Sequence, residues 1–89
     1  MAREIEFDPA KDLANRKEHN LSLAQAKDFD FSTALQVEDT RKDYKEIRTI
    51  ALGYIGNRLH VLIYTMRGEI LRPISLRKAN ARERKRYAS

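Results

Sequence analysis

The sequence predicts an α+β domain, in which a small antiparallel sheet of about four strands follows two helices and precedes a short basic helix. Two observations favour this class. Apolar and polar side chains alternate along successive runs after residue 46, and the turn pairs Gly56-Asn57 and Arg67-Gly68 separate these runs. Capping residues precede three further segments, at Asp8, Ser22 and Asn80. We therefore expect an antiparallel meander with helices on one face.

The first helix is expected from Pro9 to about Glu18. Asp8 is a good N-cap, proline fits the first helical position, and Asn20 tolerates the left-handed conformation that ends a helix. Residues 5–7, ahead of this helix, alternate as a short additional edge strand would. Helical spacing puts four residues on one side of the helix, which are Ala10, Leu13, Ala14 and Lys17.

A second helix is expected from the Ser22 cap to about Asp28. Ser22 and Gln25 have the spacing of a capping box. The side chains that this helix should bury, together with the residue that follows it, are Leu23, Ala26 and Phe29.

Four strands and a last helix should complete the fold. A weak strand is expected at 33–38, a polar loop at 39–45, and stronger strands at 47–54, 59–66 and 69–75. Pro73 cannot donate to a ladder, so its strand should lie at an edge or its ladder should break near Arg72. Asn80 and Glu83 have capping-box spacing and should open a helix that reaches Tyr87.

Composition limits the classes of protein that the chain can be. Its 89 residues suffice for a single domain, 1–89, with a thin core. Because there is no cysteine, neither a disulfide nor a thiolate metal site is expected. No long apolar run and no basic-then-apolar leader is present. We expect a cytoplasmic protein without a membrane span.

Charge is unevenly distributed along the chain. Residues 1–45 have a net charge of −2, whereas residues 46–89 have a net charge of +7. The last eighteen residues hold seven basic side chains and one acid. A positive face of this kind binds polyanions such as nucleic acid by counterion release.

The clustered side chains suit phosphodiester chemistry better than metal or nucleotide chemistry. His19 and His60 lie 41 residues apart without cysteine, and three scattered glycines form no phosphate loop. Arginines and lysines can stabilise charge on phosphorus while a histidine or tyrosine moves a proton. A ribonuclease needs no metal for this reaction, because the RNA 2′-OH is the nucleophile, and no cofactor is expected.

Several segments match the pattern of a known family in register over nearly the whole chain. They are Phe7–Lys11, Asn15, His19, Ser22, Glu46–Arg48, Tyr64–Glu69, Arg72, Ile74–Ala79 and Glu83–Tyr87. Through them the chain resembles the BrnT family of type II toxins. The resemblance implies a RelE-like fold and a ribonuclease that inhibits translation. It also implies a BrnA-like antitoxin with a ribbon-helix-helix domain, and an antitoxin complex that binds operator DNA and represses its own operon.

The sequence departs from the family pattern in three places. The family usually has Lys-His-Gly after the first helix, where this chain has Glu18-His19-Asn20. Leu23 replaces a common phenylalanine, and Pro73 replaces an apolar strand residue beside Arg72.

Six residues are the candidates for catalysis. Arg48, Arg72 and Arg77 would stabilise the transition state, and Lys78 would assist them. His19 is the first choice for proton transfer and Tyr64 the second. Each also has a structural interpretation, since His19 could cap a helix, Tyr64 could pack in the core, and the arginines could pair with carboxylates. Binding of RNA outside the reaction centre is expected from Arg67, Arg82, Lys85 and Arg86.

Two other functions remain open from the sequence. The chain could be a catalytically weak binding module that dimerises and acts with a DNA-binding antitoxin as an autorepressor. It could also be an RNA-binding accessory domain without a partner. Because apolar residues occupy both sides of the predicted sheet, we expect a homodimer or a 2:2 complex.

Overall fold

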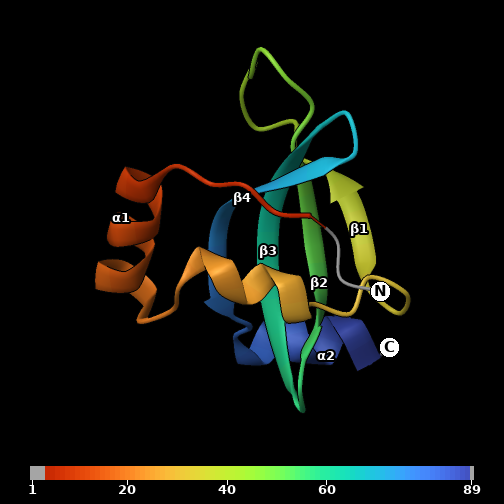
Figure 1. Ribbon diagram of the computed structural model, residues 1–89. Coiled ribbons are helices and arrows are strands. Elements are labelled where there is room, and N and C mark those ends of the chain that lie inside the picture. Colours follow the sequence, from red (N-terminus) through yellow and green to blue (C-terminus); the bar gives the residue numbers. More distant parts are fainter. Residues whose placement is uncertain (1–3, 89) are drawn as a thin grey trace.

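The computed structural model describes residues 4–88 and has the predicted α+β class (Figure 1). Its elements are α1 (Pro9–His19), the 3₁₀ helix η1 (Leu23–Asp28), β1 (Leu35–Glu38), β2 (Thr49–Ile55), β3 (Arg58–Arg67), β4 (Ile70–Lys78) and α2 (Ala81–Ala88). The strands form one antiparallel sheet in the order β1-β2-β3-β4, so the predicted meander is confirmed. Its turns use Gly56 and Gly68 at φ values of 62° and 59°, which glycine adopts without strain.

β4 satisfies both expectations for a proline-containing strand. It is an edge strand of the four-stranded sheet, and its pairing with β3 shifts register between Ile63 and Tyr64, next to Pro73. Residues 5–7 do not form a full strand. Ile5 makes a single parallel bridge to Leu71, which ties the N-terminal segment to the outer edge of β4.

The side of α1 that helical spacing groups together does not face the core. Leu13 is 54% exposed, and Ala10, Ala14 and Lys17 are exposed as well, whereas Asp12 and Asn15 are each 5% exposed. The helix is held by polar contacts to distant segments instead of by an apolar side. Such partners cannot be read from helical periodicity, which reports only apolar faces.

Two buried polar side chains anchor α1. Asp12 accepts the backbone N–H of Leu23 at 2.7 Å, which lowers the pKa of its carboxyl group below the usual value. Asn15 accepts the N–H of Leu76 at 3.0 Å and donates to the carbonyl oxygens of Leu76 and Leu21 at 2.9 Å each. An amide that bonds one residue in both directions imitates a neighbouring strand, so Asn15 closes the edge of β4 at this point.

The second helical segment is a 3₁₀ helix and not an α-helix. The Ser22 hydroxyl accepts from the N–H of Ala24 at 3.1 Å, so the expected cap is present. The three side chains predicted to be buried, Leu23, Ala26 and Phe29, are 5% exposed or less. Its six residues make it longer than most 3₁₀ helices, which rarely exceed about four residues.

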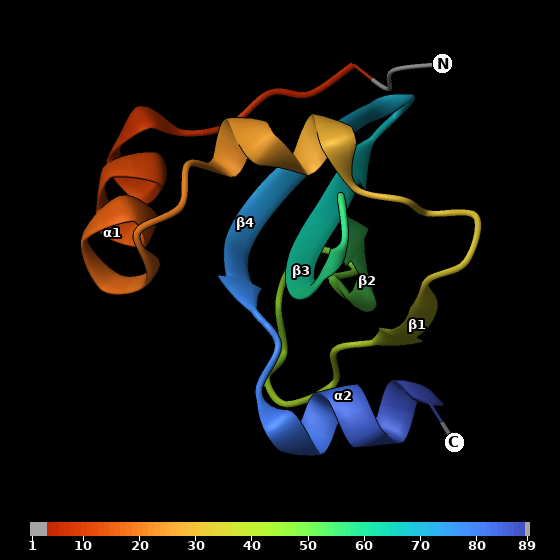
Figure 2. The same ribbon diagram turned by 90° about the horizontal axis from the view of Figure 1, so that it is seen from below.

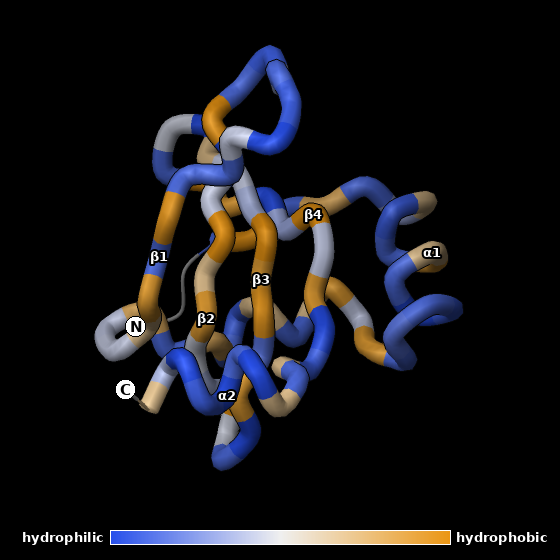
Figure 3. Tube along the Cα trace, turned by 180° about the vertical axis from the view of Figure 1, so that it is seen from behind, coloured by the Kyte–Doolittle hydropathy of each residue, from blue (hydrophilic) through white to orange (hydrophobic). Residues whose placement is uncertain are grey.

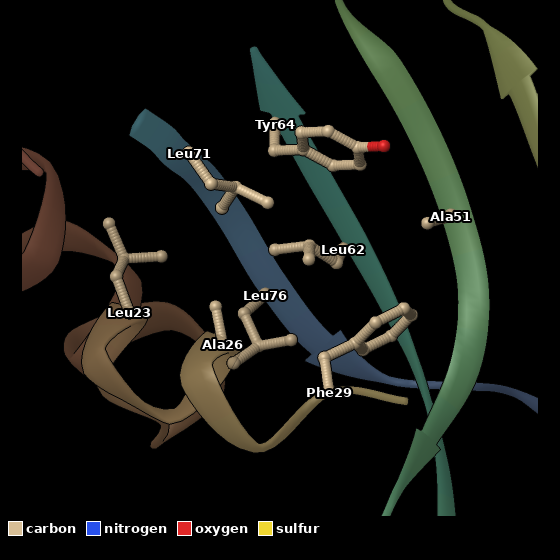
Figure 4. Packing of buried hydrophobic residues seen from close by; sticks show 8 residues of the cluster. All are labelled: Leu23, Ala26, Phe29, Ala51, Leu62, Tyr64, Leu71 and Leu76. Carbon is tan, nitrogen blue, oxygen red and sulfur yellow. The ribbon is translucent and has the colours of Figure 1, made fainter. Parts of the chain in front are cut away.

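The main core lies between η1 and one face of the sheet, which we call the η1 face (Figure 4). Its buried members are Leu23, Ala26, Phe29, Ala51, Leu62, Tyr64, Leu71 and Leu76. A second, smaller cluster lies on the other face, which we call the α2 face. Its members are Leu52, Leu59, Val61 and Ala79, with Ile50 and Tyr87 packed against them.

Helices therefore lie on both faces of the sheet, and the expectation of one covered face is wrong (Figure 2). A reciprocal capping box starts α2 directly after β4, with hydrogen bonds of 2.9 and 2.8 Å between Asn80 and Glu83. At the far end of α2, Tyr87 packs edge-to-face on Tyr54 and donates its hydroxyl to the carbonyl oxygen of Thr33 at 2.8 Å. These contacts fold α2 back over the sheet.

Candidate functional site

Two of the predicted arginines lie in one row across the α2 face. Thr65 pairs with Arg72 on β4. Thr49 pairs with Tyr64, so continuing this register by one residue places Arg48 on the other side of Thr65. The Thr65 hydroxyl donates to the carbonyl oxygen of Ile47 at 2.8 Å, which holds the end of β2 beside β3. We call Arg48, Thr65 and Arg72 the arginine row.

Arg48 is held by an aromatic ring and not by a carboxylate. Its guanidinium carbon lies 4.0 Å from the centroid of the Tyr44 ring, which is a cation–π distance. Its buried Nε atom has no hydrogen-bond partner within the described part of the chain. Among residues 4–88, no carboxylate lies within ion-pair distance of Arg48. Its charge is therefore available to an anion.

The loop that carries Tyr44 is organised by Asp39. This carboxylate accepts two hydrogen bonds from Arg41 at 2.8 Å each and one from the Tyr44 hydroxyl at 3.2 Å. The bonds from Arg41 hold the pKa of the Asp39 carboxyl group well below its usual range. The backbone N–H of Asp39 also donates to the carbonyl oxygen of Arg48 at 2.7 Å. Asp39 thus links the loop to the strand end where Arg48 lies.

Arg72 forms an ion pair with Glu6 of the N-terminal segment. The Glu6 side chain is 57% exposed, whereas that of Arg72 is 21% exposed. Ion pairs with such an exposed partner contribute little stability, so a phosphate can replace the carboxylate at small cost.

Arg77 and Lys78 lie at the other end of β4. Arg77 pairs with Val61, four residues before Thr65 on β3, which corresponds to about 13 Å along a strand. Arg77 donates to both carboxylate oxygens of Glu83, at 2.8 and 2.7 Å. This pairing raises the pKa of Arg77 and lowers that of Glu83. It is the carboxylate pairing that we considered as the structural interpretation of this arginine.

Both histidines lie away from the arginine row. α1 runs beside β4 in the same direction, with Ile5 near Leu71 and Asn15 bonded to Leu76 (Figure 1). His19, one helical turn after Asn15, is therefore nearer the Lys78 end. It lies 3.8 Å from the carboxylate of Glu18, the residue that departs from the family pattern.

His60 is the neighbour of Lys78 that the sequence argument considered only for zinc. It pairs with Lys78 across the strands and lies on the η1 face, and it is 5% exposed. Its Nδ1 atom lies 2.8 Å from the carbonyl oxygen of Arg58. Burial lowers the pKa of this histidine, so it is neutral at pH 7. Nothing in the strand pattern distinguishes it from an ordinary core residue.

Tyr64 belongs to the η1 core and is separated from the arginine row by the sheet (Figure 4). It is 8% exposed, its hydroxyl donates to Gln36, and its ring packs edge-to-face on Phe31. The structure therefore does not bring Tyr64 together with Arg48, Arg72 and Arg77.

The cations that were predicted to bind RNA outside the reaction centre lie at exposed positions. Arg67 is the last residue of β3 and lies two residues beyond Thr65. Arg82, Lys85 and Arg86 belong to α2, which appears as a hydrophilic segment across the sheet in Figure 3.

Within residues 4–88, no group of three His, Cys, Asp or Glu side chains is arranged to hold a metal ion. None of the described helices is long and apolar enough to span a membrane.

Comparison with known protein families identifies the family of the chain. A family model described as "Ribonuclease toxin, BrnT, of type II toxin-antitoxin system" matches residues 7–83. The chain belongs to the BrnT family. The resemblance found in the sequence is thereby confirmed. No curated protein sequence matches the chain.

BrnT proteins are ribonuclease toxins of type II toxin-antitoxin systems, so a cognate antitoxin is implied. The BrnT match includes all six candidate catalytic residues. It ends at Glu83, before the last basic residues of α2.

Proposed function

We propose that this protein is a metal-independent endoribonuclease toxin whose arginine row stabilises the transition state of RNA cleavage. The 2′-oxygen attacks the adjacent phosphorus, the bond from phosphorus to the 5′-oxygen breaks, and a 2′,3′-cyclic phosphate remains. Cleavage of RNA in this RelE-like manner would inhibit translation until a BrnA-like antitoxin neutralises the toxin.

The observation that carries this proposal is the position of Arg48 and Arg72 on either side of Thr65. Neighbouring strands are about 4.8 Å apart, so the two arginines start about 10 Å apart on one face. Arginine side chains that begin at this separation can both reach a single phosphate placed between them. Each guanidinium offers donors in a planar fork that fits phosphate oxygens. Donors placed before the reaction stabilise the charge that develops on phosphorus.

Arg77 and Lys78 would bind a neighbouring part of the RNA backbone in this proposal. They lie about 13 Å along the sheet from the arginine row, which is too far for the same phosphate oxygens. The exposed cations Arg67, Arg82, Lys85 and Arg86 would add contacts to the backbone without sequence preference.

The sequence assigns proton transfer to His19 first and Tyr64 second. Because His19 lies towards the Lys78 end of β4 and Tyr64 lies on the opposite face from the arginine row, substitution tests whether either takes part. His19→Ala should lower the cleavage rate if His19 moves the proton of the 2′-OH or of the leaving 5′-oxygen. Tyr64→Phe tests the alternative, because it keeps the ring in the core and removes only the hydroxyl. If neither variant changes the rate at its optimum pH, stabilisation of charge by the arginine row accounts for catalysis.

A second function is favoured by two specific contacts. The guanidinium of Arg77 is engaged by Glu83, and Tyr64 is buried on the η1 face. Both withdraw predicted groups from chemistry, as expected for a catalytically weak module that acts with the antitoxin as an autorepressor.

Incubation of the purified protein with RNA in the presence of EDTA separates the two functions. The proposal predicts cleavage products that carry 2′,3′-cyclic phosphate ends. It also predicts that a substrate with a 2′-deoxy residue at the cleaved position stays intact, because the nucleophile is missing. Absence of cleavage by protein that binds its antitoxin would favour the binding module, and cleavage that EDTA abolishes would contradict metal independence.

A further inference from the structure

The α2 face carries an apolar groove that is separate from the arginine row. It has a volume of about 300 Å³ and is lined by Leu35, Gln36, Val37, Ile50, Leu52, Val61, Glu83 and Arg86. The side chains of Leu35 and Val37 remain 49% and 56% exposed. They lie on the same face as Leu52 and Ile50, their partners on β2. Leu35 and Val37, which are alternate residues of β1, therefore present apolar surface to solvent.

The outer edge of β1 borders this groove and is unpaired within the described chain. Among the described strands, β1 pairs with β2 alone, in antiparallel register. The N–H of Asp39 points to β2, where it bonds Arg48, and backbone direction alternates along a strand. The N–H and C=O groups of Gln36 and Glu38 therefore point away from the sheet. An exposed edge of this kind is a template for an added strand.

The positive charge around the groove favours a negatively charged partner. α2 borders the groove and carries four basic side chains and one acid, and this acid, Glu83, is paired with Arg77. A second copy added at β1 would bring another basic helix to the same continuous sheet face, in a chain of net charge +5. An acidic polypeptide avoids this repulsion and gains attraction.

We propose that the antitoxin inserts an extended acidic segment along β1, which adds a strand to the sheet and places alternate apolar side chains in the groove. This inference rests on the proposed function for its partner, because family membership supplies the antitoxin. It deepens that function by explaining neutralisation. The paired residues Val37 and Ile50 of the groove lie two residues, about 7 Å, from the arginine row. Acidic side chains of the added strand would thus reach Arg48 and exclude RNA.

Calorimetric titration with the cognate antitoxin tests the groove. Val37→Glu and Leu35→Glu should each raise the dissociation constant about tenfold or more, as for loss of an apolar anchor next to a like charge. The matched control is Leu13→Glu, because Leu13 is equally exposed but lies on α1. It should change the dissociation constant less than twofold.

A second pair of variants tests strand addition itself. Glu38→Pro removes an N–H group that points away from β2, and Glu38→Ala removes the same side chain but keeps that N–H. The proline variant should bind the antitoxin several-fold more weakly than the alanine variant. Equal binding by the two would overturn strand addition.

Two further results would also overturn the inference. One is an unchanged antitoxin affinity of correctly folded Val37→Glu, as judged by circular dichroism. The other is loss of self-association or of RNA binding in Val37→Glu while antitoxin affinity stays the same, since a second copy or RNA would then occupy the groove. RNA cleavage by the unmodified protein is measured separately. If that protein does not cleave RNA but Val37→Glu still weakens antitoxin binding, the result contradicts the proposed catalysis and supports the groove.

Discussion

Arg77 and Glu83 form a two-point ion pair that fastens the basic helix α2 to the end of β4. Glu83 also closes the capping box with Asn80, so one carboxylate fixes both the start and the position of the helix. Since Tyr87 and Arg86 lie further along the same helix, this pair also shapes the apolar groove of the α2 face.

Removal of this carboxylate should weaken the fold. Glu83→Gln keeps the size of the side chain but loses the charge, and we expect a loss of about 1–2 kcal/mol in the free energy of unfolding. Urea denaturation measures it, with Glu69→Gln in an exposed turn as control. Because the pKa of Glu83 is lowered in the folded protein, its stabilisation is present above the unfolded pKa and is lost as pH falls through the folded value. Below that pH the two proteins should converge.

The anchor of α1 should be polar and not apolar. Asn15→Ala leaves the N–H and C=O groups of Leu76 without their partner and should cost about 2–3 kcal/mol. Leu13→Ala, on the exposed side of the same helix, should cost less than about 0.5 kcal/mol. Chemical denaturation of the two variants compares them directly. A larger loss for Leu13→Ala would show that the helix packs by its apolar side.

The ring beneath Arg48 should position that arginine for RNA cleavage. Tyr44→Phe keeps the cation–π contact and loses only the bond to Asp39, so its cleavage rate should fall less than about threefold. Tyr44→Ala removes the ring and should lower the rate about tenfold or more, because correctly oriented donors carry the rate. Equal rates for the two variants, measured in single turnover, would contradict a positioning role for the ring.

His60 should make stability depend on pH. Its folded pKa is lowered by burial, so the unfolded chain binds more protons and stability rises with pH through the range just below the unfolded value of about 6.5. Thermal unfolding should give a higher Tm at pH 7.5 than at pH 5.5. His60→Gln should reduce this difference, and an unchanged difference would assign it to other groups.

The sequence predicted the sheet because its signals are local. Gly56 and Gly68 mark both hairpins, and Asn80 with Glu83 marks the start of α2. The sequence did not show how α1 is anchored, because Asn15 bonds Leu76, 61 residues away, and no periodicity records such a contact.

The arrangement of the candidate site depends on strand pairing. The sequence named Arg48 and Arg72 as candidates, but it did not show that both lie beside Thr65 on one face of the sheet. The sequence did not predict that Asp39 and Tyr44 hold Arg48, because both lie in or beside a polar loop that shows no periodic pattern. The engagement of Arg77 by Glu83 was open from the sequence, since spacing alone does not show which carboxylate turns toward which cation.

The most direct test of the arginine row is the single-turnover rate of RNA cleavage by Arg72→Ala in the presence of EDTA. Arg58→Ala, which removes an exposed cation at the opposite hairpin, is the control for net charge. We expect Arg72→Ala to cleave about 10²–10³-fold more slowly than the unmodified protein, as for loss of one oxyanion donor. Arg58→Ala should keep its rate within about threefold, because it removes charge at the far end of the sheet. A folded Arg72→Ala protein that cleaves RNA as fast as Arg58→Ala would contradict the account.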